Sequence, residues 1–283
     1  MRVDVSGKDG TMVFDSIDDL RKEVEKHPDS KVLDFGGRRM KDFFGGIGST
    51  TELLELARTG WESEVEDILK VSEDTLDTIE QTFEIQAWQS VYDVTGSDVD
   101  VDRYLSGQPE NMISYVMMDT PKVGRVISLA INVGASGVVE AETITARGKN
   151  VVALVHALES LGLRTELYAD LPAKGSNDYD VRSRTVVKVK SADETLDPAM
   201  VMFAFAHPAF MRGFMLTSME AYPEKFGKGL GVESGYGIPT KGWGTELFPE
   251  GTIQVSSNMT GMWDRSMAER FVIEHLRELG IID

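Results

Sequence analysis

The sequence predicts an α/β fold with a parallel-rich, doubly wound sheet and an α+β N-terminal region. Three patterns that follow one another carry this prediction. Arg125–Val133 is a short apolar run typical of a strand buried on both faces. Asn150–Leu161 has apolar residues at helical spacing, and Leu163–Ala169 alternates like a second strand. We therefore expect a right-handed βαβ unit with two parallel interior strands, in a sheet that has helices on both faces.

The first 120 residues are expected to form an acidic α+β accessory region. Ser16 is a predicted N-cap, and acidic residues occupy the first turn of the helix that follows it. The predicted elements are, in chain order, a strand at Thr11–Phe14, a helix at Ile17–Lys26 and a strand at Lys31–Phe35.

A glycine-rich segment, Gly45–Thr50, precedes the next predicted helix. One interpretation is a phosphate-binding loop, but the segment lacks the Lys-Ser/Thr of a P-loop and no strand leads into it. We favour a capping box, Ser49-Thr-Thr-Glu52, at the start of a helix that ends at Thr59-Gly60. Residues 61–82 are predicted to be mostly helical with a solvated acidic face.

Two aspartate-rich patterns follow a predicted strand at Phe83–Tyr92. Asp93–Ser97 resembles the Asp-x-Ser-x-Ser type of metal loop, and Asp98–Asp102 resembles the start of a calcium loop. Helix-breaking residues follow the first pattern, and the second has Arg103 where a calcium loop turns on glycine. We interpret both as aspartates of an exposed loop or strand edge.

Pro121 and Gly124 mark the predicted boundary between residues 1–120 and an α/β domain formed by residues 121–283. In this domain Pro172–Asp180 is predicted to be a polar loop. Tyr222–Glu250 has no periodicity, so it is either a functional loop or contains elements that the pattern does not reveal. The other predicted elements are strands at Arg184–Val189, Arg212–Thr217 and Thr252–Ser256 and helices at Pro198–Phe205 and Arg265–Leu279.

Composition narrows the classes of function. The formal net charge of −18 argues against nucleic-acid binding, because binding to phosphates depends on Lys and Arg. No apolar run reaches the length of a membrane span, and no signal-peptide core is present, so we expect no membrane association. The absence of cysteine excludes disulfides and thiolate metal sites, which fits a cytoplasmic protein.

The order of elements over residues 124–283 resembles the von Willebrand factor A fold. The metal-loop position of that family falls on Asn132–Ser136, where Ser136 matches but Asn132 and Gly134 replace the aspartate and the first serine. Thr217-Ser-Met219 stands where such domains often carry Ser-Asp-Gly. Because hard divalent cations prefer carboxylate ligands, the resemblance implies a degenerate A-type domain without a metal.

The whole chain also resembles an uncharacterised family of proteins encoded by tailed viruses of bacteria and archaea. The residues that carry this resemblance are Gly60-Trp61, Gly107-Gln-Pro-Glu110 and Ala206-His-Pro208. It implies a viral or mobile-element setting, with the protein in the cytoplasm of the host cell or in the virion.

Patterns of catalytic residues are sparse. The four histidines are not spaced as metal ligands are. His207 differs from the others because it lies between a predicted helix end and Pro208; we interpret it as structural. Ser136 lies in Gly134-Ala-Ser-Gly137, which is not the nucleophile elbow of hydrolases. We therefore expect no catalytic residue, no metal and no cofactor.

The expected function is a non-enzymatic protein–protein interaction module; the alternative is a virion structural or assembly protein that forms an oligomer. We expect the working face at the carboxyl ends of the parallel strands, in the loops Asn132–Gly137, Asp170–Asp180, Thr217–Tyr222 and Ser256–Trp263. The partner-binding candidates in these loops are Asn132, Gly134, Ser136, Thr217, Ser218, Ser257 and Asn258.

Overall fold

The computed structural model describes residues 1–35, 38–66, 69, 89–96, 98–116, 125–160, 162–232, 234–244 and 246–255. A mixed seven-stranded sheet lies at its centre, so the fold is α/β as predicted. The sheet order is β1 (Arg2–Ser6), β2 (Asp9–Phe14), β8 (Arg182–Lys190), β7 (Arg164–Lys174), β6 (Val126–Asn132) and β10 (Ile253–Val255), and β9 (Ile238–Pro239) pairs with β7. The strand pairs β2–β8, β6–β7 and β6–β10 are parallel, whereas β1–β2, β7–β8 and β7–β9 are antiparallel.

The predicted βαβ unit is confirmed. Strand β6 runs parallel to β7 with Val126 opposite Arg164 and Asn132 opposite Asp170, and helix α6 (Ala141–Ser160) connects them. Six consecutive residues of β6, Ile127–Asn132, are buried, as expected of an interior strand. The helix is longer than the apolar stripe at 150–161 indicates, because its first turns are half exposed and mixed in composition.

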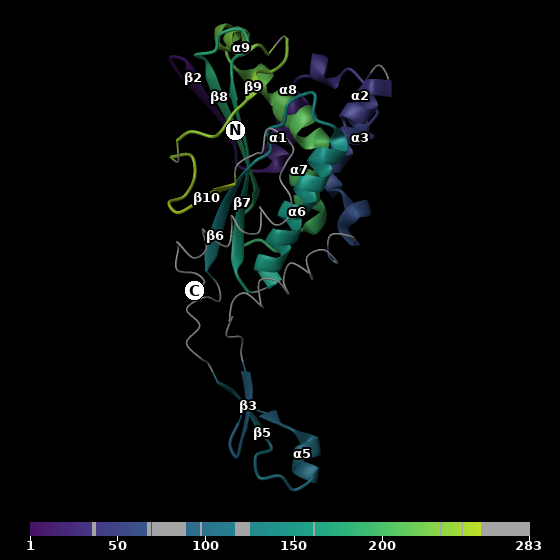
Figure 1. The fold of residues 1–283 in the computed structure, drawn as a ribbon, viewed down its shortest axis with the longest axis vertical. Coiled ribbons are helices and arrows are strands. Elements are labelled where there is room, and N and C mark those ends of the chain that lie inside the picture. Colours follow the sequence, from purple (N-terminus) through teal and green to yellow (C-terminus); the bar gives the residue numbers. More distant parts are fainter. Residues whose placement is uncertain are drawn as a thin grey trace.

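Helices α1 (Ile17–Val24), α6 and α7 (Pro198–Ala206) lie on one face of the sheet, and the segment around residues 240–252 lies on the other (Figure 1). The strand pairings make this sheet mixed and partly parallel. The helix predicted at Arg265–Leu279 lies outside the described residues. Strands β1 and β2 and helix α1 precede residue 120, yet they join the sheet of the second half of the chain.

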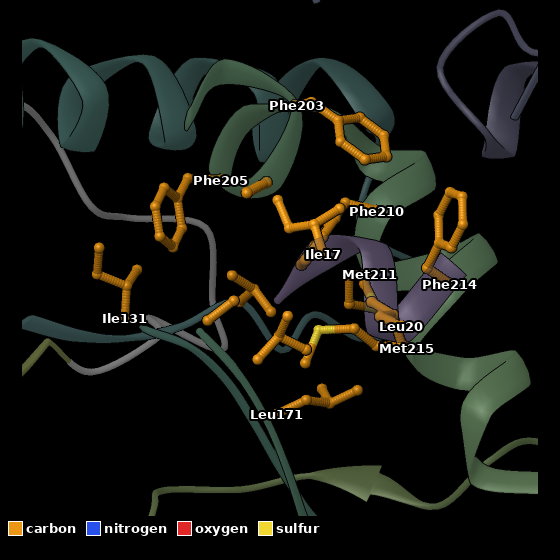
Figure 2. Packing of buried hydrophobic residues seen from close by; sticks show 14 of the residues in the cluster. Ile17, Leu20, Ile131, Leu171, Phe203, Phe205, Phe210, Met211, Phe214 and Met215 are labelled. Atoms are coloured by element: carbon orange, nitrogen blue, oxygen red, sulfur yellow. The ribbon is translucent and has the colours of Figure 1, made fainter. Parts of the chain in front are cut away.

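The apolar layer between sheet and helices forms the core (Figure 2). Side chains from three sources meet there: Ile131 and Leu171 from the sheet, Ile17 and Leu20 from α1, and Phe205, Phe210, Met211 and Met215 from the segment after residue 198. Gly148 lets α6 approach α7 closely, because a Cβ at this position would lie 2.1 Å from the carbonyl oxygen of Phe205 in α7.

The strand predicted at Arg212–Thr217 is wrong. His207 and Pro208 end α7, and the chain continues as a π-helix, η3 (Phe210–Met215), then α8 (Leu216–Ser218) and η4 (Met219–Ala221). A short apolar run does not distinguish a buried strand from a buried helix, and here all six residues of η3 are buried. Among the described residues no single helix has the length and apolar composition of a membrane span; only the bent pair of 198–206 and 210–221 reaches them together.

The strand predicted at Lys31–Phe35 is also wrong. Lys31–Leu33 forms a 3₁₀ turn, η1, in which the Ser30 hydroxyl accepts a hydrogen bond from the Val32 amide at 3.3 Å. The predicted loop Pro172–Asp180 begins later than expected, because β7 continues to Lys174. The aperiodic segment 222–250 contains helix α9 (Glu224–Leu230) and strand β9.

Several local predictions are confirmed. Ser16 accepts a hydrogen bond from the Asp19 amide at the start of α1. Ser49 accepts from the Glu52 amide at the start of α3 (Thr50–Thr59), and Gly60 ends that helix with φ of 74°. The Glu52 carboxylate accepts from the Gly48 amide rather than from Ser49. The remaining helical turns near α3 are α2 (Arg38–Phe43) and η2 (Glu62–Glu64).

A second, three-stranded sheet forms a small unit of residues 89–96 and 98–116. It comprises β3 (Gln89–Asp93), β4 (Asp98–Val99), helix α5 (Val101–Leu105) and β5 (Met112–Val116). Strands β3 and β4 both pair with β5 in antiparallel orientation. The aspartates of the calcium-like pattern have structural roles here: Asp98 starts the edge strand β4, and the Asp100 carboxylate caps α5 by accepting from the Arg103 amide at 3.0 Å. The predicted boundary at residue 121 lies outside the described residues.

Candidate functional site

Strand β6 ends at Asn132, whose side chain organises the loop that follows. Its Oδ1 accepts a hydrogen bond from the Gly134 amide at 2.9 Å, and its Nδ2 donates to the Thr240 carbonyl at 3.0 Å. The Asn132 carbonyl accepts from Arg147 of α6. Asn132 is buried, so its amide holds the loop 133–137 and the segment after β9 in place. A Cβ on Gly134 would meet that amide oxygen at 3.0 Å.

A cavity of about 410 Å³ opens beside this loop and the last residues of β7. Ser136 and Gly137 line it from the loop, while Leu171 and Ala173 line it from β7. Most of its other walls are apolar: Val32, Met40, Phe43, Ala135, Met211, Leu216, Ile238 and Pro239. Figure 2 shows Leu171 and Met211 among the side chains of the adjoining core. Ser136 is therefore the predicted site residue that the structure places on a cavity.

Arg212 is the charged residue buried at this cavity. It is 1% exposed and comes from the π-helix η3. Its Nη1 donates to the Phe43 carbonyl at 2.7 Å and its Nη2 to the Val139 carbonyl at 2.5 Å, whereas its Nε has no hydrogen-bond partner. Burial lowers the pKa of Arg212 to about 10, and the charge of Glu140 opposes this.

A second cavity of about 390 Å³ adjoins the first, and both are lined by Lys31 and Tyr236. Tyr236 has a positive φ of 58°, an uncommon conformation for a large side chain. Its hydroxyl donates to the Glu220 carboxylate at 2.5 Å, and Ser30 donates to the same oxygen at 2.6 Å. Burial, together with Glu220, raises the pKa of Tyr236. The tyrosine is thereby fixed in the wall between the two cavities.

Thr217 and Ser218 are buried in α8 rather than displayed on a loop. The Thr217 hydroxyl lies 3.5 Å from the Ser30 hydroxyl, and Ser218 donates to the Met215 carbonyl at 2.8 Å. The other two candidates, Ser257 and Asn258, lie outside the described residues. The structure thus brings Asn132, Gly134 and Ser136 together in one loop, of which Ser136 lines the cavity, and uses Thr217 and Ser218 inside the helical layer.

The opposite face of the sheet carries a buried ion pair that no sequence motif indicated. Arg184 of β8 donates to both carboxylate oxygens of Asp170 on β7, at 2.9 Å each. Its remaining donors reach the carbonyls of Trp243 and Gly244 and the side chain of Gln254. Burial raises the pKa of Asp170, and the Arg184 guanidinium opposes this. With its donors satisfied, this pair anchors the segment that covers the sheet.

The small unit exposes a group of large apolar side chains. Its members are Tyr92, Val94, Val99, Val101, Tyr104 and Leu105, with Leu105 76% and Tyr104 63% exposed. We call these six residues the small-unit patch. Arg103 stacks its guanidinium 3.6 Å from the centre of the Tyr92 ring, so the only basic side chain of the small unit is already engaged. Scattered apolar residues are ordinary on a surface, but a concentration on one short segment is typical of contact surfaces.

Within the described residues, no group of three or more Asp, Glu and His side chains is arranged to hold a metal ion. The comparison with known proteins adds one result, since a family model covers residues 5–283 of the chain. The chain belongs to the family DUF7192, a domain of unknown function. No curated protein and no solved structure matches it significantly, so the DUF7192 assignment carries no inherited activity.

Proposed function

We propose that this DUF7192 chain is a non-enzymatic protein–protein interaction module, and that the small-unit patch is its docking surface. The observation that carries the proposal is the concentration of exposed apolar residues between Tyr92 and Leu105. Removing such side chains from water on contact with a partner is the main favourable contribution to protein association.

The negative charge around the small-unit patch favours a partner with a basic surface. The small unit has five acidic residues, Asp93, Asp98, Asp100, Asp102 and Glu110, against one basic residue, Arg103. A protein surface with an apolar centre and a rim of Lys and Arg complements it, because opposite charges favour the encounter and exclude acidic competitors. The alternative, a virion structural or assembly protein that self-associates, brings two such acidic surfaces together and needs salt to screen them.

The test uses the variant Tyr104→Ser with Leu105→Ser and a matched control, Val138→Ser with Tyr179→Ser, which removes exposed apolar side chains from loops next to the seven-stranded sheet. Each chain is immobilised and exposed to a lysate of host cells; captured proteins are identified, purified and titrated by calorimetry. We expect capture by the wild type and the control, loss in the patch variant, and weaker binding at higher salt. A partner retained by the patch variant places the docking surface elsewhere.

Sedimentation of the purified chain distinguishes the interaction module from the self-associating assembly protein. Self-association that increases with salt and is lost in the patch variant supports an assembly role. A monomer at all salt concentrations, together with capture of a basic partner, supports the interaction module. The viral setting of either role rests on the resemblance carried by segments such as Gly60-Trp61 and Ala206-His-Pro208.

We also propose that the sheet is a degenerate, doubly wound A-type arrangement. The parallel β10–β6–β7 order and the βαβ unit support it. The antiparallel β7–β8 pair is a departure that mixed α/β sheets tolerate. In a doubly wound arrangement helices cover both faces of the sheet, so an experimental structure with helices on one face alone would overturn the assignment.

A further inference from the structure

Arg184 and Arg212 are the largest fully buried side chains in the part of the chain that the structure describes, and their surroundings differ. Arg184 is neutralised by Asp170 through two hydrogen bonds. Arg212 donates to the carbonyls of Phe43 and Val139, and the nearby charge of Glu140 acts on it without an ion pair between the two. Burying a charge without a directly paired counter-charge is costly, so a counter-ion supplied from outside stabilises this site.

Arg212 lies beside a cavity that can hold such a counter-ion. Arg212 lines the cavity of about 410 Å³, and Phe43 of α2 lies across its guanidinium with 4.0 Å between ring centre and Cζ. The residue is held in a π-helical stretch, a conformation that is rare and concentrates at functional sites. Exposed Lys31 lines the same cavity and adds a second positive charge to its wall.

The cavity walls restrict the kind of anion. Eleven of the residues that line it are aliphatic, aromatic or methionine side chains or proline, and its volume lies in the range of small-ligand pockets. A phosphate ion cannot use these apolar walls. A carboxylate with an apolar body can, because the planar guanidinium complements the carboxylate and the walls enclose the rest.

We propose that this cavity binds an organic carboxylate, whose charge neutralises Arg212 and whose apolar body fills the space between the β6–α6 loop and helix η3. The site is separate from the small-unit patch and does not depend on the proposed function. The carboxylate belongs either to a free organic acid or to the C-terminus of a peptide, and the experiment distinguishes these two sources.

The experiment is calorimetric titration of the full chain with matched probes. Octanoate carries the charge and the apolar body, 1-octanol carries only the body, and inorganic phosphate carries only charge. We expect saturable binding of octanoate, at least tenfold weaker binding of 1-octanol and none of phosphate. A short peptide that ends in leucine, with a free or amidated C-terminus, tests the second source; tighter binding of the free-acid peptide than of octanoate identifies it.

Arg212→Met removes the charge with little change of volume, and Arg164→Met, an exposed site on β7, is the matched control. We expect Arg212→Met to lose the preference for octanoate over 1-octanol and the control to keep it. Equal binding of the two probes by the unaltered chain overturns the proposal and needs no variant. Absence of binding by every carboxylate probe, or a preference retained in folded Arg212→Met, overturns it as well.

Discussion

Trp61 packs edge-on against the imidazole of His207, with 4.7 Å between the ring centres. The contact joins two segments far apart in the sequence, Gly60-Trp61 after α3 and Ala206-His-Pro208 after α7. Gly60 permits it, since a Cβ there would lie 2.5 Å from the backbone of Ala199. The Trp61 amide donates to the Ala199 carbonyl at 2.8 Å. Both segments therefore serve to dock α3 on α7.

His207 should make the fold sensitive to acid. It is buried, its Nδ1 accepts from the Ala209 amide at 3.1 Å, and burial lowers its pKa from 6.5 to about 4. As pH falls below 6.5, the unfolded chain takes up this proton before the folded chain does, so stability is lost. The loss by pH 4 is about 3 kcal/mol of unfolding free energy.

The measurement is urea unfolding between pH 7 and pH 4 of the wild type and of His207→Asn, which keeps an acceptor for Ala209. The variant is expected to be less stable at neutral pH, because the contact with Trp61 is lost, and to show a flatter dependence on pH. Parallel pH curves for the two proteins would assign the acid sensitivity to other groups.

Asn132, Ser136 and Thr217 should bind no divalent cation. The Asn132 amide oxygen already accepts from Gly134, Thr217 is buried in α8, and neither position supplies the carboxylate that hard cations prefer. Calorimetric titration with magnesium, manganese or calcium is expected to give no saturable binding at these residues. Tight binding that disappears in Ser136→Ala would contradict this.

The sequence predicted the βαβ unit because two periodicities coincide there with clear ends. Strand β6 is mostly apolar and Gly162 follows α6, so neighbouring signals agree. The caps at Ser16 and Ser49 were predictable because one side-chain oxygen satisfies one amide close in sequence. The caps depend on local interactions alone.

The errors arose where tertiary packing decides the conformation. Phe210–Thr217 is apolar enough to be a strand or a helix, and contact with the sheet and α1 selects the helical form. The ion pair of Asp170 and Arg184 joins residues fourteen positions apart through the β7–β8 pairing. Neither residue belongs to a motif, so their proximity follows only from the strand register.

The sequence indicated the loop that borders the cavity but not the arginine buried beside it. The carboxyl end of β6 was expected to be the working face, and Ser136 lies on a cavity there. Arg212 reaches that cavity because η3 is a helix, whereas a strand at 212–217 gave the residue no such position. An arginine inside an otherwise apolar run was the one signal in the sequence that could have indicated it.

Gly148→Ala should destabilise the fold. Alanine favours a helix by about 1 kcal/mol over glycine, but its Cβ would lie 2.1 Å from the Phe205 carbonyl and 2.2 Å from the Ala206 Cα. Backbone atoms cannot move aside as a side chain can, so α6 and α7 must separate, at a cost of about 3 kcal/mol. Thermal and urea unfolding measure it. Gly137→Ala, with nothing within 4 Å of the added Cβ, is the control and should be near neutral.

An exposed arginine–aspartate ion pair of this chain can serve as a control for the buried pair of Arg184 and Asp170. Arg182 of β8 contacts Asp9 of β2 with the same two-pronged geometry, at 2.8 and 2.7 Å, but these side chains are 47% and 46% exposed. The Arg184–Asp170 pair differs in burial, at 0% and 4%, and in the further hydrogen bonds of Arg184 to Trp243, Gly244 and Gln254. A comparison of the two pairs therefore measures the effect of burial together with that of these contacts.

Asp170→Asn or Arg184→Met should each lower the free energy of unfolding by about 3–5 kcal/mol, because each leaves a buried charge without its counter-charge. The double variant should cost less than the sum of the two, since it removes both charges together. Asp9→Asn and Arg182→Met should have far smaller effects, because water already solvates and screens that pair. Urea unfolding of both sets gives the coupling energies. Equal losses in the two sets would mean that Asp170 and Arg184 remain accessible to water, and that the segment carrying Trp243 and Gly244 does not seal this face of the sheet.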